Sequence, residues 1–171
     1  MAESIIINKS NSTEEIYKAL LPQINSLLNP NEPLISNLSN VTAALKDAFD
    51  KISWVGFYFL KEATLFLGPF QGKVACTSIQ FGKGVCGIAA EKKETIIVED
   101  VEKFPGHIAC DANSKSEIVA PLTENQKVFG VLDIDSYSLA AFNSVDKYYI
   151  ETLCKTLVKK LDFKLVKQIL S

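Results

Sequence analysis

Residues 52–60 read Ile-Ser-Trp-Val-Gly-Phe-Tyr-Phe-Leu, and residues 64–70 read Thr-Leu-Phe-Leu-Gly-Pro-Phe. Both stretches are rich in aromatic and β-branched residues, which favour strands over helices. Only Lys61-Glu62-Ala63 separates them, which is enough for a hairpin loop but too short for a crossover helix. The two stretches therefore predict a pair of antiparallel strands in the middle of the chain.

Further strands are expected on the C-terminal side of this hairpin. They are predicted at residues 75–80, 95–98, 117–121 and 127–135. A short helix is expected to open in the glycine-rich stretch 81–87 and to continue through Ala90. Residues 99–114 are polar and rich in turn formers, and they predict a long connection.

Helical periodicity marks both ends of the chain. Amphipathic helices are predicted over about 12–28 and 34–49, separated by the helix breakers of residues 29–33, and a long one from Val145 to Leu170. Helices, paired strands and a closing helix form an α+β pattern. The short links favour a central antiparallel sheet with helices packed on one face. The other face is then free to carry loops and a pocket.

Composition limits the class of protein. The chain has 171 residues, 47% of them hydrophobic and 22% charged, which predicts one globular domain over residues 1–171. The net charge of −2 gives no electrostatic footprint for nucleic acid or an anionic membrane. No apolar run approaches the ~20 residues of a membrane span, and Ile5-Ile6-Ile7 is too short for a signal-peptide core. We expect a cytoplasmic setting, in which cysteines are thiols at rest.

Four cysteines stand at positions 76, 86, 110 and 154. None forms a Cys-x-x-Cys pair, and structural zinc usually takes its ligands in close pairs, so no metal is expected. His107 and Cys110 are nevertheless close enough in sequence to seed a zinc site. Cys154 falls on the apolar face of the closing helix, which predicts core packing.

The other three cysteines lie in or beside predicted loops. Cys110 precedes Asp111 in a polar, turn-rich segment. Cys86 is flanked by glycines at a predicted helix start, where the field of the helix favours a thiolate. Cys76 lies near the start of a predicted strand. For each of the three, local chemistry leaves both a reactive thiol and buried packing open.

The stretch 131–136, Val-Leu-Asp-Ile-Asp-Ser, places two carboxylates on one strand face. Asp133 and Asp135 would lie about 6–7 Å apart, which is unfavourable without a cation or hydrogen-bond donors. Glu117, at the start of the neighbouring predicted strand, could join them. The face is either a solvated sheet surface or a recess for an ammonium group. Trp54, the only tryptophan, either packs in the core or forms the wall of a small pocket.

Six stretches together resemble the free methionine-(R)-sulfoxide reductases, a family of GAF-domain enzymes. In chain order they are residues 54–58, 67–77, 82–87, 104–111, 114–119 and 130–136. The resemblance covers about residues 15–160, and it is specific because three cysteines lie inside the motifs. It implies a GAF-like antiparallel sheet with helices, in agreement with the pattern above.

The resemblance also implies an activity and a role for each cysteine. The family reduces the R epimer of free methionine sulfoxide but not peptide-bound residues. Cys110 would attack the sulfoxide and become a sulfenic acid, and Cys76 would resolve it to a disulfide. Cys86 corresponds to a cysteine that has been given a catalytic part in some members. The implied enzyme binds no cofactor, receives electrons from the thioredoxin and NADPH system, and forms a homodimer.

The carboxylates then acquire expected roles. Glu117 or Asp135 would protonate the leaving oxygen if burial raises its pKa. Asp133, with these two neighbours, would hold the substrate's α-ammonium, and Trp54 would pack against the S-methyl group. Acids near the attacking thiol oppose thiolate formation, so reactivity would depend on the bound ammonium.

Two rival functions follow from the same residues. A non-enzymatic GAF sensor would bind a small ligand such as a cyclic nucleotide and would tolerate Cys110→Ser. A thiol redox sensor or peroxidase-like protein would react with hydrogen peroxide in the absence of a sulfoxide. The acidic cluster has no evident task in the second rival.

Overall fold

The computed structural model describes residues 4–108 and 110–166 of the chain. In these residues the helical segments are α1 (Thr13–Leu27), α2 (Leu34–Ala48), α3 (Gly84–Lys92), η1 (Val101–Lys103), α4 (Ser144–Lys160) and η2 (Phe163–Leu165). The strands are β1 (Trp54–Lys61), β2 (Thr64–Gln71), β3 (Ser78–Gln80), β4 (Ile96–Val98), β5 (Ser116–Glu124) and β6 (Lys127–Ser136). None of the described helices has the length and apolar character needed to cross a lipid bilayer.

The strands form one sheet in the order β3-β2-β1-β6-β5-β4, in which all neighbours are antiparallel. The β1–β2 and β5–β6 pairs are hairpins, as their short loops predict. The β1–β6 pair joins strands from opposite ends of the domain and aligns Trp54 with Asp135. This long-range pair, which no local pattern specifies, places the acidic stretch of β6 at the centre of the sheet.

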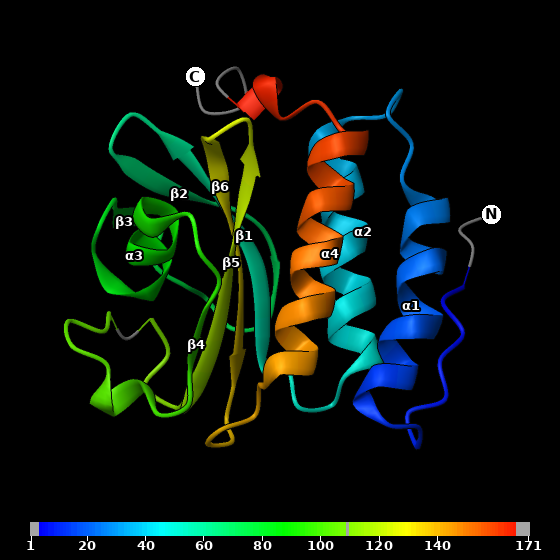
Figure 1. Cartoon of the computed structure of the whole chain (residues 1–171), viewed down its shortest axis with the longest axis horizontal. Helices are drawn as coiled ribbons and strands as arrows, with labels where there is room; N and C mark the ends of the chain where they lie inside the picture. Colours follow the sequence, from blue (N-terminus) through cyan, green and yellow to red (C-terminus); the bar gives the residue numbers. More distant parts are fainter. Residues whose placement is uncertain (1–3, 109, 167–171) are drawn as a thin grey trace.

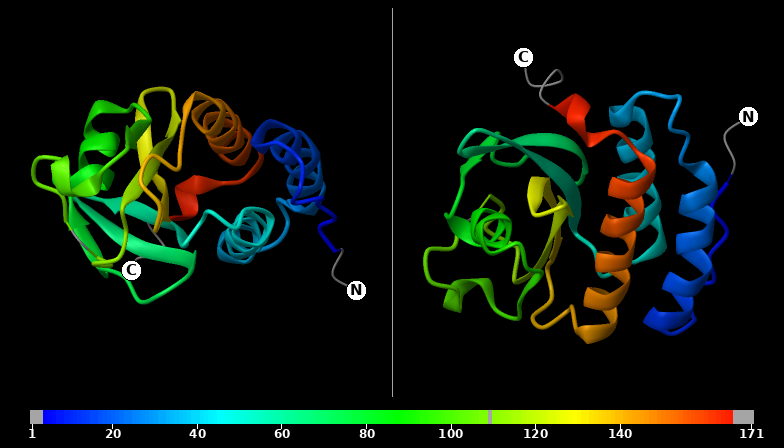
Figure 2. Two further views of the ribbon diagram at one scale, coloured as in Figure 1. Left: turned by 90° about the horizontal axis from the view of Figure 1, so that it is seen from below. Right: turned by 45° about the horizontal axis from the view of Figure 1, so that its top comes forward.

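The sheet separates two apolar layers (Figures 1 and 2). Helices α2 and α4 lie on one face, and α1 packs on the outside of these two helices. Their core includes Phe57, Phe59 and Leu132 from the sheet. The opposite face carries the short helix α3 and the long connections, as expected for a face left to loops and a pocket. The expected α+β, GAF-like architecture is confirmed.

Local hydrogen bonds set where the long helices begin. Ser12 and Glu15 form a capping box at α1, and Asn143 and Asp146 form one at α4. Asp146 is fully buried, and its carboxylate accepts hydrogen bonds from Tyr17 and from Lys51 at 3.0 and 2.6 Å. The carboxylate thus ties the N-terminal helix, the entry to β1 and the closing helix together.

The closing helix is shorter than predicted. It ends at Lys160 instead of continuing to Leu170, and residues 167–170 of that prediction lie outside the described residues. Asp162 accepts a hydrogen bond from the backbone of Lys164 and starts a 3₁₀ turn. Phe163 then turns back to pack against Phe129 of β6, with ring centroids 5.8 Å apart. Burial of an aromatic ring therefore outweighs continuation of the helix.

The strand predicted at 75–80 is formed only over Ser78–Gln80. Cys76 lies in a loop instead of at the strand's start, because its carbonyl accepts a hydrogen bond from the Tyr58 hydroxyl at 3.0 Å. Cys154 is buried among the apolar residues between α4 and the sheet, as its position on the helix predicted.

Candidate active site

Cross-strand pairing builds a row of functional side chains on the face away from the long helices. Asp135 of β6 lies opposite Trp54 of β1 on one side and opposite Glu117 of β5 on the other. Asp133, two residues before Asp135 in β6, lies opposite Gly56 of β1 and Val119 of β5. Glu117 and Asp133 are only 5% and 7% exposed. The expected sharing of one face by the two aspartates is confirmed, and Glu117 does join them.

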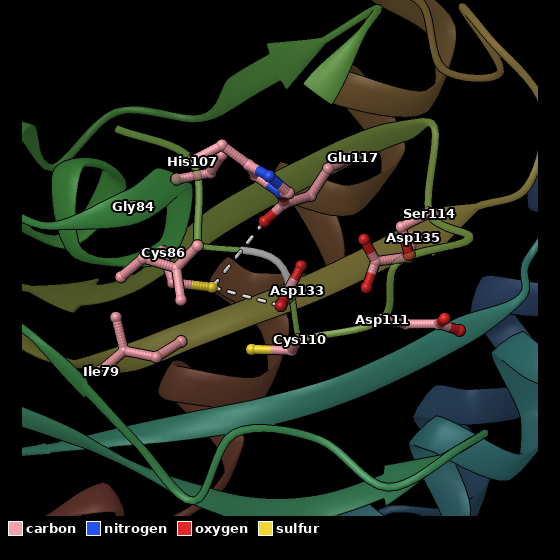
Figure 3. A pocket seen from close by; sticks show the side chains of 12 residues that line it. Ile79, Gly84, Cys86, His107, Cys110, Asp111, Ser114, Glu117, Asp133 and Asp135 are labelled. Atoms are coloured by element: carbon pink, nitrogen blue, oxygen red, sulfur yellow. Dashed lines mark hydrogen bonds and ion pairs between the residues drawn. The ribbon is translucent and has the colours of Figure 1, made fainter. Parts of the chain in front are cut away.

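Helix α3 brings Cys86 onto this acidic row (Figure 3). Its sulfur lies 3.2 Å from Asp133 Oδ2 and 4.0 Å from Glu117 Oε1. Gly84 opens the helix with a φ of +59°, and a Cβ there would press on Ile108 of the loop before Cys110. The glycine therefore lets α3 and the Cys110 loop approach each other closely.

Of the two possibilities that the sequence leaves open for Cys86, the structure favours a buried neutral thiol over a thiolate stabilised by the helix field. Burial raises the pKa of Cys86 well above its ordinary value, and the charges of Asp133 and Glu117 raise it further. The neutral thiol instead donates its proton toward Asp133. Helix fields act over one turn at modest strength, whereas desolvation beside two carboxyls acts directly on the sulfur.

The three carboxyl groups are pushed toward different protonation states. Burial raises the pKa of Asp133 from 3.8 to about 6, a rise held back by the hydrogen bond from Cys86. Burial and then the charge of Asp133 hold the pKa of Glu117 well above its usual range. Burial and then the charge of Asp133 also raise the pKa of Asp135 well above its usual range. The row therefore favours a charge on Asp133 at neutral pH, while the raised pKa values of Glu117 and Asp135 favour their protonated forms.

His107 covers the acidic row from the long connection. Its Nε2 lies 3.7 Å from Glu117 Oε2, and partial burial lowers the pKa of the imidazole. The lowered pKa of His107 and the raised pKa of Glu117 both favour the neutral forms, and a neutral pair needs no counter-charge when it is buried.

Cys76 and Cys110 form a disulfide beside this row, with their Cα atoms 5.4 Å apart. The bond agrees with the pairing that the resemblance implies, and it differs from the expectation of four thiols at rest. Lys73 and Asp111 add an ion pair of 3.5 Å between the same two loops. The resolving and attacking cysteines of the implied reaction are therefore within bonding distance in this fold.

Two aromatic side chains of β1 hold the Cys76 loop. Trp54 Nε1 donates to the carbonyl of Lys73 at 3.0 Å, and the Tyr58 hydroxyl donates to that of Cys76 at 3.0 Å. The indole lies over Gly56, where a Cβ would collide with it, and it stacks on Phe70 with centroids 5.5 Å apart. Trp54 is buried in the core and also lines a small cavity. Core packing and a pocket wall, the two roles left open by the sequence, are therefore both present.

Two small cavities flank Cys110. One, of about 30 Å³, is bordered by Cys86, His107, Glu117 and Asp133. The other, of about 20 Å³, is bordered by Trp54, Tyr58, Val74, Asp133 and Asp135. A water needs about 10–15 Å³ on this scale. With the disulfide formed, the two cavities have room for water molecules but not for an amino acid.

Several residues of the site were not predicted as functional. Strand alternation predicts that Tyr58 lies on the same face of β1 as Trp54, because the two residues are four positions apart in the strand. Lys73 pairs with Asp111, and Ser114 hydrogen-bonds to Asp135. Neither residue gives a signal in the sequence, because both contacts depend on how the long connections fold. His107 was considered only as a zinc ligand, and the structure places it on Glu117 instead.

Because Asp133 is buried, removal of its charge is expected to increase the free energy of unfolding by an amount that depends on pH. Asp133→Asn is expected to stabilise the fold by about 1–3 kcal/mol above pH 6, since one pKa unit corresponds to about 1.4 kcal/mol. Folding raises this pKa from 3.8 to about 6. The gain should shrink as pH falls through about 6 and vanish below about pH 3, where Asp133 is protonated in both the folded and the unfolded state. Urea denaturation across this range measures it, and a pH-independent difference would assign the effect to packing.

The architecture and the site define a GAF domain. A sequence profile of the GAF domain matches residues 37–159. The chain is 52% identical over 158 residues to GAF domain-containing protein A of Dictyostelium discoideum, which covers 92% of this chain and 99% of that protein.

More specific likenesses concern relatives that are named as enzymes. The chain is 46% identical over 171 residues to the free methionine-R-sulfoxide reductase of Saccharomyces cerevisiae, covering 95% of each. Its fold matches the crystal structure of free methionine-R-sulfoxide reductase from Neisseria meningitidis in complex with its substrate. That match has a TM-score of 0.87 and 43% identity, and it covers 97% of this chain and 99% of that one. The chain belongs to the GAF-domain family of free methionine-R-sulfoxide reductases.

Proposed function

We propose that this protein reduces free L-methionine-(R)-sulfoxide to methionine. The observation that carries the proposal is the Cys76–Cys110 disulfide at the edge of a buried acidic row. A disulfide is the oxidised product left on the enzyme after one turnover, and the row offers both a proton donor and a negative charge for the substrate. The likeness to reductases over nearly the whole chain supports the same conclusion.

The reaction proceeds in two steps on the protein. The Cys110 thiolate attacks the sulfoxide sulfur, the protonated oxygen transfers to Cys110, and methionine leaves a cysteine sulfenic acid behind. The Cys76 thiol then attacks that sulfur and releases water, which forms the disulfide. One sulfoxide is reduced by two electrons, and two thiols are oxidised to one disulfide.

The raised carboxyl pKa values fit the proton requirement of the first step. The sulfoxide oxygen leaves only when protonated, and burial raises the pKa values of Glu117 and Asp135, which favours the protonated forms that could donate to it. Asp135 borders both cavities beside Cys110, and Glu117 borders the cavity that contains Cys86. Either carboxyl could therefore donate its proton directly or through water.

Asp133 supplies the charge that recognises a free amino acid. With a pKa of about 6 it is ionised at neutral pH, and its carboxylate would receive charge-assisted hydrogen bonds from the α-ammonium. A methionine sulfoxide inside a peptide lacks this ammonium and would leave the buried charge unpaired. Trp54 would pack against the S-methyl group and select the R epimer. The arriving ammonium also offsets the acids that oppose the Cys110 thiolate.

An external dithiol protein of the thioredoxin type completes the cycle by exchange with the Cys76–Cys110 disulfide. NADPH would supply its electrons, with no cofactor bound to this chain. Such regeneration places the enzyme in a reducing compartment such as the cytoplasm. The homodimer implied by the resemblance stays a prediction.

Thioredoxin-coupled oxidation of NADPH tests the proposal on three substrates: the free R epimer, the free S epimer and an N-acetylated R-sulfoxide. We expect turnover on the free R epimer alone. Absence of turnover on all three, with folded and reduced protein, would refute the reductase function and favour a ligand-binding GAF module. Consumption of hydrogen peroxide without a sulfoxide would favour the peroxidase-like alternative.

A further inference from the structure

One buried cluster combines a thiol with two carboxyls from three different elements. Cys86 of α3, Glu117 of β5 and Asp133 of β6 place their candidate ligand atoms within 4.8 Å of one another. We propose that this triad is an inhibitory binding site for a thiol-preferring divalent cation, Zn²⁺ or Cd²⁺. The site is separate from the reactive disulfide, because neither Cys76 nor Cys110 contributes a ligand.

The separations fit tetrahedral coordination. With zinc–sulfur and zinc–oxygen bonds of about 2.3 and 2.0 Å, a tetrahedron sets sulfur and oxygen about 3.5 Å apart. The observed distances from Cys86 Sγ are 3.2 Å to Asp133 Oδ2 and 4.0 Å to Glu117 Oε1. Adjustments of a few tenths of an ångström at flexible side-chain ends therefore complete the geometry. Figure 3 shows the three side chains converging on one point.

A second observation indicates that this cluster lacks a cationic partner. Asp133 is only 7% exposed, yet its Oδ1 has no hydrogen-bond partner within the described part of the chain. A buried carboxylate oxygen without a partner is costly, and it is commonly explained by an absent ion or ligand. A divalent ion between Asp133 and Glu117 would also remove the repulsion between these acids.

The donor set distinguishes between metals. A thiolate with two carboxylates suits Zn²⁺ or Cd²⁺, whereas Mg²⁺ and Ca²⁺ demand oxygen ligands only. Three protein ligands leave a fourth position for water in the adjoining cavity. His107 Nε2, at 3.7 Å from the second oxygen of Glu117, occupies the place of an outer partner that orients a ligand. Sequence spacing could not indicate the triad, because its ligands lie 31 and 16 residues apart along the chain.

Metal binding would block the enzyme at the place where the substrate binds. The ion would displace the protons of the Cys86 thiol and the Glu117 carboxyl, and it would occupy the Asp133 carboxylate that the proposed function assigns to the α-ammonium. Only this competition rests on the proposed function. Metal binding itself depends on the triad alone.

Calorimetric titration of Zn²⁺ into tag-free protein with the Cys76–Cys110 disulfide intact tests the site. In this state Cys86 and Cys154 are the free thiols. We expect one ion per chain, no binding of Mg²⁺, and sulfur-to-metal charge-transfer absorbance when Cd²⁺ is added. Cys86→Ser should weaken binding by more than about 100-fold, beyond the effect of outer-shell changes. The matched Cys154→Ala variant should bind as the wild type does.

Three results would overturn the site: absence of Zn²⁺ binding, binding without cadmium–thiolate absorbance, or full affinity in folded Cys86→Ser. If Cys86→Ser does not fold, Asp133→Asn takes its place, with an expected loss of at least 10-fold. Competition is measured separately by adding methionine sulfoxide to metal-loaded Cys76→Ser/Cys110→Ser protein, which can neither form the disulfide nor turn the sulfoxide over. Zinc binding that the sulfoxide does not displace would leave the metal site standing and contradict the assignment of Asp133 to the substrate.

Discussion

Cys110→Ser is expected to abolish turnover of free methionine-(R)-sulfoxide, with a loss of about 10⁴-fold or more in kcat. A serine hydroxyl does not attack the sulfoxide sulfur at a useful rate and cannot accept its oxygen as a sulfenic acid. Nor can it pair with Cys76. The side chains differ by one atom, and the site with its 5.4 Å Cα separation from Cys76 has room for either. The loss therefore reports on chemistry rather than on folding.

Two matched variants make this result specific. Cys154→Ala removes a buried thiol from the opposite face of the sheet, and it should leave turnover unchanged. Cys76→Ser keeps the attacking thiol, so rapid-quench measurement should find about one methionine formed per enzyme without continued oxidation of NADPH. Sustained turnover by Cys110→Ser would contradict the assignment and transfer the attack to Cys86 or Cys76.

Local sequence predicts most of the fold, because its elements carry their own signals. The hairpin of residues 52–70 is specified by aromatic strands around a three-residue loop. The helix at 12–28 follows from its cap and periodicity. The prediction fails where a contact between residues distant in sequence determines the local structure. Phe163, for example, packs on Phe129 instead of continuing the helix. Cys76 leaves its predicted strand for the same kind of reason, the hydrogen bond from Tyr58.

The site is predictable in its parts but not in its assembly. Strand alternation places Asp133 and Asp135 on one face, and the family motif supplies the cysteines. The pairing of Trp54 with Asp135 depends on β1 and β6 meeting across about 80 residues. The state of Cys86 depends on three elements converging, so a local argument from the helix field gives the wrong protonation. Burial and neighbouring charge, which set pKa values, are properties of the folded chain.

Asp133→Asn is expected to lower kcat/KM for the free R-sulfoxide by about 10²–10³-fold. Truncating one partner of a buried, hydrogen-bonded charge pair costs about 2–5 kcal/mol, and asparagine keeps the shape while removing the charge that meets the α-ammonium. The wild type should prefer the free over the N-acetylated sulfoxide by about 10⁴-fold. The preference should be smaller in the variant. Without the Asp133 carboxylate, binding of the N-acetylated substrate no longer leaves a buried charge unpaired.

The control is a carboxylate outside the pocket. Asp100 is partly buried and forms an ion pair at 2.8 Å with the exposed Lys103, so Asp100→Asn changes the net charge equally without touching the acidic row. It should leave both kcat/KM values within about twofold. An Asp133→Asn enzyme that retained the full preference for the free amino acid would show that another group recognises the ammonium.

The same substitution also tests why the acidic row exists. If Asp133 served the fold, its removal would weaken both stability and activity together. The buried charge instead predicts opposite signs, with a more stable protein above pH 6 and a poorer reductase. Within the described residues, no lysine or arginine is paired with Glu117, Asp133 or Asp135, and under the proposed function the substrate's ammonium would supply a positive charge there. Substrate binding would then offset the free energy spent in burying the Asp133 charge. On the proposed function, the preference for a free amino acid would follow from the burial of this carboxylate in the sheet.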